Sequence, residues 1–252
     1  MPNLKDAYNL CAGVLKPQRQ GTCGLYCFWF STLLLNSINT NQKPIVYPRK
    51  HEQRTADPSV TKGNEARSLR DFAKTSLGSG QGELLTISEI LTTIIRFRWD
   101  WVVHVSGGEE RRAFITDQLK ANKPVMFSHL AGGARAMPIT VVPPDRQCGP
   151  HWSLIIDEDA DHYEFIEPNE PTALKRERKD VVLESNANVD AFAMDKTWVK
   201  PVFRKDGTIP LAISSAQLPE LQKLYPTLDF SPAATYDVSR RQALNNLLVA
   251  VC

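Results

Sequence analysis

The longest apolar stretch of the chain lies at residues 24–37, directly after a polar, glycine-containing loop at 18–22. Its aromatic and leucine side chains fall on nearly all sides of a helix, a distribution typical of a helix buried in a domain core. Apolar residues at helical spacing predict two amphipathic helices further on, at 65–76 and 87–95. The segment 39–64 contains three prolines among many polar residues, and it predicts a long surface loop.

Beyond residue 98 the pattern changes from helices toward strands. In chain order, the predicted elements are a strand at 99–105, a helix at 110–121, strands at 125–130, 152–156, 163–166 and 196–203, and helices at 215–225 and 238–251. The acidic segment Asp157–Asp161 has the composition of a turn, so the strands on either side of it predict a β-hairpin. A helical first half and a largely β second half predict an α+β protein whose halves meet along a cleft.

Composition narrows the function classes. The chain has 252 residues, of which 42% are hydrophobic and 23% charged, as expected of a folded globular protein. Thirty basic and 28 acidic residues give a net charge of +2 without a dominant basic run, so nucleic acid is not an expected partner. Residues 1–16 contain no continuous apolar segment, so neither a secretory signal nor a membrane partner is predicted.

Cysteine usage bears on the compartment. Five cysteines, an odd number, are spread thinly over the chain, and this argues for a reducing environment rather than a disulfide framework. We therefore expect a cytoplasmic protein, or one delivered into a host cell without a classical signal peptide.

Cys23 is the candidate nucleophile because it stands at the predicted start of the buried helix. There the positive end of the helix dipole favours a thiolate over a thiol. Five residues upstream, the side-chain amide of Gln18 can donate a hydrogen bond to an oxyanion, and the backbone N–H of Cys23 can donate a second. Gln20 is the less favoured donor. The alternative is that Cys23 and Gly24 serve only packing.

His151 is the candidate base. It opens a predicted strand directly after a Gly-Pro loop, whereas His129, for example, ends an apolar run. If the hairpin closes symmetrically about Asp159, His151 lies opposite Glu167 on the same face of the sheet. Glu167 would then orient the imidazole, which takes the proton of Cys23. Asn169, two residues beyond this register, is the alternative third member.

A structural zinc site is the competing interpretation. Cys23, Cys27, Cys148 and His151 together offer four suitable ligands. The segment after Cys23 is too apolar for the turn that presents paired zinc thiolates, and the first pair lacks the usual two-residue spacing. Cys27 is therefore expected to pack one helical turn below Cys23, and we predict neither a metal nor a cofactor.

These motifs resemble those of the papain-like cysteine peptidases, in particular the actin maturation protease family and the related bacteriocin-processing (C39-like) peptidase domains. The resemblance covers about residues 15–203. The matching motifs are Gln18 followed after four residues by Cys23-Gly24-Leu25, then Gln81-Gly82-Glu83, His151-Trp152, His162-Tyr163, and Glu167 where the family usually has aspartate.

The resemblance implies a papain-like fold at 1–204, with the nucleophile helix packed against an antiparallel sheet. Residues 205–252 fall outside it and are expected to form a helical extension packed on this domain. The resemblance further implies a cysteine peptidase acting on a protein or peptide substrate, with N-terminal processing of actin as the suggested reaction. The same groups would serve a glutamine deamidase or an acyl transferase. The interpretation from a different class is a catalytically inactive protein-binding module on the same fold.

Overall fold

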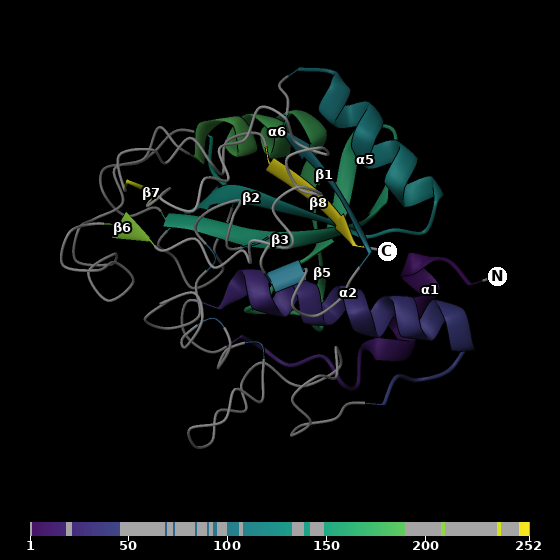
Figure 1. Cartoon of the computed structure of the whole chain (residues 1–252). Helices are drawn as coiled ribbons and strands as arrows, with labels where there is room; N and C mark the ends of the chain where they lie inside the picture. The colour runs from purple at the N-terminus through teal and green to yellow at the C-terminus, as the bar shows by residue number, and fades with distance from the viewer. Residues whose placement is uncertain are drawn as a thin grey trace.

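The sheet at the centre of the protein joins strands that are far apart in the sequence. The computed structural model describes residues 2–18, 22–45, 100–105, 108–132, 139–141, 149–189, 208–209, 236–237 and 247–251, together with Leu69, Ala73, Leu84, Ile90, Thr93 and Ile94. Within these residues, six antiparallel strands form one sheet in the order β1-β8-β2-β3-β4-β5 (Figure 1).

The bounds of the strands confirm most of the predicted β segments. They are β1 Trp101–Val105, β2 Val125–Ala131, β3 Gly149–Glu158, β4 His162–Ile166, β5 Leu174–Arg178 and β8 Leu247–Val251, and a separate two-stranded sheet pairs β6 Thr208–Ile209 with β7 Tyr236–Asp237. Strand β5 was not predicted from the sequence.

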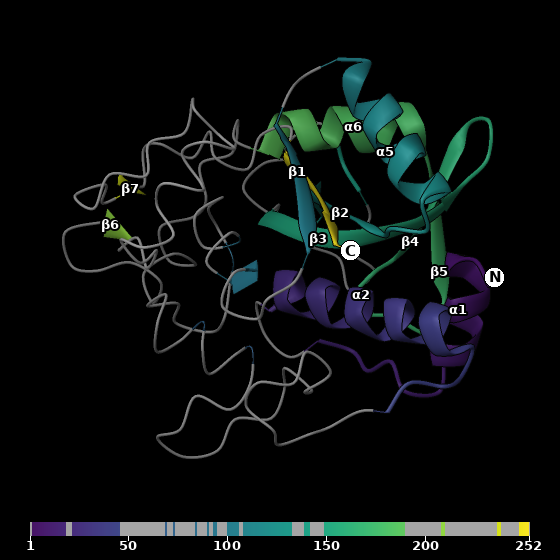
Figure 2. The same ribbon diagram turned by 45° about the vertical axis from the view of Figure 1, so that its right-hand side comes forward.

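Helices cover both faces of the six-stranded sheet, as Figures 1 and 2 show from two directions. The helices are α1 Leu4–Cys11 and α2 Cys23–Thr40 on one face, and α5 Glu110–Lys120 and α6 Lys179–Asn188 on the other. The α+β class is thereby confirmed among the described residues. Leu69, Ala73, Ile90 and Ile94 are helical and buried, in agreement with the two amphipathic helices predicted there.

Two hydrophobic clusters fill the space between the sheet and these helices. Successive strand residues point to opposite faces, so Trp152 and Leu154 of β3 pack toward α2 while Ile155 packs toward α6. The cluster on the α2 side includes Trp29, Phe30, Trp152, Leu154 and Ile166, and the other includes Phe127, Ile155, Tyr163, Phe165 and Val182. The central strands are therefore covered on both sides.

Helix α2 has the most apolar surroundings of the described helices, as its sequence predicted. Buried residues occur on every side of it from Cys23 to Leu34, and each buried large side chain contributes about 1.5–3 kcal/mol to folding. The helix ends at Thr40, and Asn41 follows in the left-handed conformation (φ 52°), donating its backbone N–H to Ser37 O.

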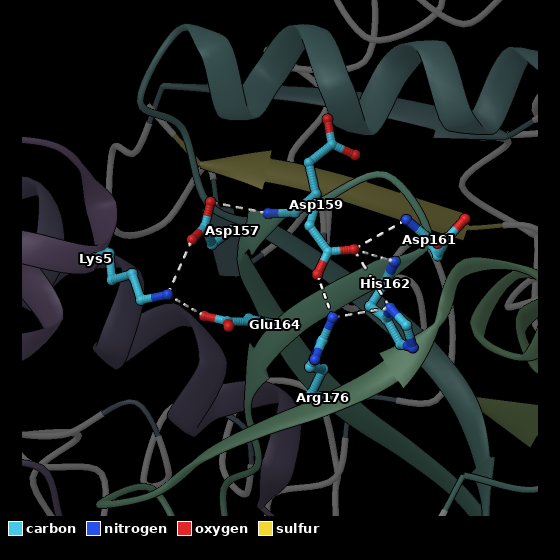
Figure 3. A network of polar contacts seen from close by, with 8 residues as sticks. Lys5, Asp157, Asp159, Asp161, His162, Glu164 and Arg176 are labelled. Carbon is cyan, nitrogen blue, oxygen red and sulfur yellow. Dashed lines mark hydrogen bonds and ion pairs between the residues drawn. The ribbon is translucent and has the colours of Figure 1, made fainter.

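Helix α1 was not predicted, because its apolar residues are few and interrupted by charges. Asn3 and Asp6 form a capping box that satisfies the first backbone N–H groups of the helix. The Lys5 side chain then reaches Glu164 (2.7 Å) and Asp157 (3.3 Å), as Figure 3 shows. Tyr8 donates its hydroxyl to Pro171 O (3.1 Å). These contacts fix α1 to the β3–β4 hairpin and to the turn that follows it.

The turn of the hairpin differs from the symmetrical turn predicted about Asp159. The Asp159 carboxylate accepts hydrogen bonds from the backbone of Asp161 and His162, both at 2.9 Å, and contacts Arg176 of β5 (Figure 3). Asp159 therefore caps the turn instead of forming its centre. Next to the turn, Glu158 pairs with Tyr163, three residues from the predicted register, and a bulge between Ile155 and Asp157 reduces the difference to two residues.

The C-terminal prediction was wrong where the structure describes it. Leu247–Val251, expected at the end of a helix, is strand β8, which pairs with β1 on one side and β2 on the other. Its five residues are all buried, so an apolar run that suits a helical face here fills an inner strand. This segment is part of the main sheet and not of a helical extension packed on it.

Three further predictions lie outside the described residues. They are most of the loop at 39–64, the strand at 196–203 and the helix at 215–225. Among the described helices, none combines the length and the hydropathy required to cross a membrane.

Candidate active site

Cys23 is the first residue of α2, as predicted. The residue before it, Thr22, accepts the backbone N–H of Tyr26 at 3.1 Å and so starts the helix. The thiol lies at the positive end of the helix dipole, which stabilises a negative charge on sulfur. Only 9% of Cys23 is exposed, so this charge would be formed in a largely water-excluded environment.

Gly24 allows the sheet to approach the start of α2 closely. A β-carbon at this position would lie 3.1 Å from Leu84 Cδ1 and 3.3 Å from Trp152 Cδ1. Trp152 in turn donates its indole N–H to Leu84 O at 3.0 Å. Because Gly24 has no side chain, Trp152 can pack directly against it. This contact places His151, the neighbour of Trp152 in the sequence, next to Cys23, the neighbour of Gly24.

The structure brings Cys23, His151 and Glu167 together in one hydrogen-bonded chain. His151 Nε2 lies 2.7 Å from Glu167 Oε1, and 3% of His151 and 1% of Glu167 are exposed. The His151 side chain is also hydrogen-bonded to Cys23. Because Nε2 is engaged by the carboxylate, the nitrogen available to the sulfur is Nδ1. The predicted order of the three side chains is thus the observed one.

His151 and Glu167 meet although the predicted strand register is wrong by two residues. The structure pairs Leu154 with Ile166 and Ile155 with Phe165, and this register, continued along β3, places Asn169 and not Glu167 opposite His151. A shift of two residues keeps the same face of the sheet, so Glu167 becomes the diagonal neighbour. A glutamate side chain is long enough to cover that diagonal.

The Glu167 carboxylate is fixed by the turn that it begins. It accepts the backbone N–H of Asn169 on both oxygens (3.0 and 3.1 Å) and that of Glu170 on Oε2 (3.1 Å). Asn169, the alternative third member, donates its side-chain amide to Glu167 Oε1 at 3.0 Å. Asn169 thus supports the acid instead of replacing it. These hydrogen bonds fix the position of the carboxylate beside His151.

The electrostatic environment favours the protonated form of His151. Burial lowers the pKa of this imidazole, but attraction to Cys23, hydrogen bonds to Cys23 and Glu167, and the charge of Glu167 outweigh burial and raise the pKa to about 9. An imidazolium at neutral pH is the partner that a thiolate requires. The site can therefore hold a thiolate–imidazolium pair.

His129 is the residue of the site that the sequence analysis did not anticipate. It lies directly opposite His151 in the β2–β3 pairing, with the two ring centroids 5.3 Å apart. Burial and the charge of His151 lower the pKa of His129 to about 3, so this ring is neutral. The signal was present in the sequence, because an antiparallel pairing of the two apolar runs places one histidine against the other.

Gln18 lies beside the acid. Its backbone N–H donates to Pro168 O at 2.7 Å, which ties the loop before Cys23 to the residue after Glu167. Its side-chain Oε1 is buried and accepts no hydrogen bond within the described part of the chain. The oxyanion role of Gln18 stays a prediction, and Gln20 lies outside the described residues.

The remaining candidate ligands of the zinc interpretation are not brought together by the described structure. Cys27 is fully buried one turn below Cys23, and burial raises the pKa of its thiol well above the ordinary value. Cys148 lies outside the described residues. Within the described ranges, no group of three or more metal-ligating side chains is found.

Comparisons with protein-family models, with curated proteins and with solved structures found no match for this chain. The chemistry of the site is therefore inferred from the geometry of its own residues.

Proposed function

We propose that this protein is a papain-like cysteine hydrolase whose substrates are peptide bonds of a protein or peptide. The observation that carries the proposal is the buried hydrogen-bonded chain from Cys23 through His151 to Glu167. Its members come from the start of a helix, the start of a strand and the turn after another strand. A packing role for Cys23 alone would not require a buried imidazole and a buried carboxylate in this order.

In the first half of the reaction, the Cys23 thiolate attacks the scissile carbonyl carbon, and a C–S bond forms. The backbone N–H of Cys23 and the side-chain amide of Gln18 would stabilise the oxyanion. His151, protonated at the outset, transfers its proton to the leaving amine as the C–N bond breaks, and a thioester remains on the enzyme.

In the second half, the neutral His151 takes a proton from a water molecule that attacks the thioester. The carboxylic acid product leaves, and the thiolate–imidazolium pair is restored. Glu167 keeps the ring in one orientation throughout the cycle and compensates its positive charge whenever the ring is protonated, and its own position is held by the turn at 167–170. Every proton in this scheme is supplied by residues of the site or by water.

The substrate follows from the motif resemblance rather than from the residues of the site. Among the peptidases that the chain resembles, the actin maturation proteases suggest an N-terminal peptide of actin or of a similar protein. A glutamine side chain or a thioester would enter the same acyl-enzyme pathway, and only the leaving group and the final acceptor differ. Product analysis is therefore the decisive measurement.

The first test is the reactivity of the thiol. The rate at which iodoacetamide alkylates Cys23 is measured from pH 5 to 9 by peptide mass spectrometry, and a free cysteine peptide is the reference. We expect rapid alkylation of Cys23 to persist below pH 7, where the reference thiol is protonated. Alkylation of Cys23 no faster than the reference would contradict a catalytic role and favour the protein-binding module.

The second test identifies the reaction. Actin and a peptide library are incubated with the protein and with two variants, Cys23→Ala and the control Cys11→Ala, which removes another buried thiol far from the site. Loss of N-terminal residues from the substrate supports a peptidase, and a gain of about one dalton supports a deamidase. Both activities should disappear in Cys23→Ala and persist in Cys11→Ala.

A further inference from the structure

His129 contacts the catalytic candidate His151, and the proposed mechanism gives this contact no role. The two residues are direct cross-strand partners on β2 and β3, and their rings meet edge to face, with centroids 5.3 Å apart and an interplanar angle of 85°. His129 is 1% exposed. On its other side, its ring stacks on Phe127, with the centroids 4.9 Å apart. His129 is thus one member of a column of rings that ends at His151.

Both nitrogens of His129 are already engaged, and this fixes its tautomer. Nδ1 lies 3.2 Å from Leu130 O, which can only accept, so Nδ1 carries the hydrogen. Nε2 lies 3.0 Å from Ser153 Oγ and therefore accepts the serine hydroxyl hydrogen. The ring can neither rotate nor offer a hydrogen bond to His151. It is a rigid, uncharged surface.

This surface restricts the one motion that would disable the proposed relay. Rotation of the His151 ring would carry Nε2 away from Glu167 and the other nitrogen away from Cys23. Aromatic rings in edge-to-face contact have a preferred mutual orientation, so a fixed His129 opposes this rotation. Within the described structure, the titratable groups that face His151 are Cys23 from α2, Glu167 from the turn after β4, and His129 from β2.

We propose that His129 is a positioning residue for the thiol chemistry: its locked, neutral ring holds the His151 imidazole with Nε2 on Glu167 and the other nitrogen toward Cys23. The inference rests on the proposed function. It adds a fourth side chain to the site, one that touches neither the substrate nor the reacting sulfur and acts through His151. The orientation of His151 requires a flat ring at position 129. The two hydrogen bonds of the His129 ring keep that ring in place.

A matched pair of variants tests the requirement for a ring. His129→Phe and His129→Leu both remove the hydrogen bonds of His129 to Leu130 O and Ser153 Oγ, but only the phenylalanine keeps a ring against His151. The alkylation rate of Cys23 by iodoacetamide is measured at pH 7 with each protein, and thermal melting reports on folding. We expect His129→Leu to react about tenfold more slowly than the wild type and His129→Phe to stay within about threefold.

The outcomes separate this inference from the function on which it rests. Equal rates in the wild type and both variants, or equally reduced rates in both variants, would overturn the role of the ring while leaving the hydrolase proposal intact. A wild-type thiol no more reactive than a free cysteine peptide would overturn both. In a His151→Ala background, the difference between the phenylalanine and leucine variants should vanish, because His129 acts only through His151.

A milder variant keeps the test decisive if substitution of His129 prevents folding. Ser153→Ala removes only the hydroxyl that holds Nε2 of His129. Its control is Ser37→Ala, which removes another buried hydroxyl, hydrogen-bonded to Cys11 and about 21 Å along α2 from Cys23. We expect Ser153→Ala, which keeps the ring but holds it less firmly, to slow the alkylation of Cys23 within the same limit of about threefold as His129→Phe, and Ser37→Ala to leave it unchanged. Equal rates in the two variants would overturn the inference.

Discussion

Glu167→Gln is the substitution that most directly tests the electrostatics of the site. Glutamine has nearly the same shape as glutamate, and its carbonyl oxygen can still accept a hydrogen bond from His151. What it removes is the negative charge that lies 2.7 Å from the imidazole in a buried position. It also places an amide donor where the carboxylate accepts backbone N–H groups of Asn169 and Glu170.

The expected magnitude follows from the bond that loses its charge. A hydrogen bond to a charged partner contributes about 1.5–3 kcal/mol, so a loss of ~2 kcal/mol is a reasonable value for the imidazolium. This loss lowers the pKa of His151 from about 9 by roughly 1.5 pH units. The transfer of the proton from the thiol to the imidazole then becomes about 30-fold less favourable, and the rate of thiol alkylation at pH 7 should fall by up to this factor.

The same change predicts a pH dependence of stability. The pKa of His151 is raised from 6.5 to about 9 in the folded protein, so its protonation contributes stability that is fully present below pH 6.5 and is lost as the pH rises through about 9. Chemical denaturation should therefore show a larger difference in the free energy of unfolding between wild type and Glu167→Gln at pH 6 than at pH 9.5.

The control is Glu158→Gln, the same chemical change in a partly buried glutamate that pairs with Lys179 (2.8 Å) at the other end of β3. It should leave the alkylation rate unchanged. If Glu167→Gln is folded and its thiol reacts as fast as that of the wild type at pH 7, the buried carboxylate does not sustain the thiolate–imidazolium pair.

Other substitutions separate the parts of the site. Cys23→Ala should abolish turnover and lower the pKa of His151 below about 9, because Cys23 raises that pKa; a titration of the imidazole by NMR checks this, and an unchanged pKa would disprove the coupling. Gln18→Ala should reduce kcat/KM about 100-fold while leaving the alkylation rate of Cys23 unchanged, and a parallel fall in both would show that Gln18 acts on the thiol and not on the oxyanion. Gly24→Ala should destabilise the fold by roughly 1–2 kcal/mol in urea unfolding, because its β-carbon would press on Leu84 and Trp152; increased stability would show that helix propensity outweighs these contacts.

The sequence predicted those parts of the structure that depend on local pattern. The continuous apolar run after Cys23 could only be satisfied by burial on all sides, and α2 is buried in that way. The three side chains of the candidate site were also anticipated, because a helix start and a hairpin each restrict where a side chain can point. The papain-like assignment itself stays a proposal.

The strand register and the conformation of the C-terminal segment could not be predicted from the sequence, because contacts between distant segments determine them. The hairpin register depends on how Asp159 caps the turn and on a bulge before Asp157, neither of which the composition of the turn determines. The prediction survived because an error of two residues keeps the face of the strand. Leu247–Val251 suits a helix or an inner strand equally well by its pattern, and only the neighbours β1 and β2 decide between them.

The place of β8 in the sheet has a consequence for how the protein is made. Residue 251 pairs with residue 101, and residue 250 with residue 125, so two strands that are synthesised early wait for one that emerges more than a hundred residues later. Until then, β1 and β2 each lack a neighbour, and pairings of this separation are slow to form. In a ribosome-bound chain, helix α2 would be synthesised long before β8 could join β1 to β2 and complete the sheet. The thiol of Cys23 should therefore become reactive only after β8 has been synthesised.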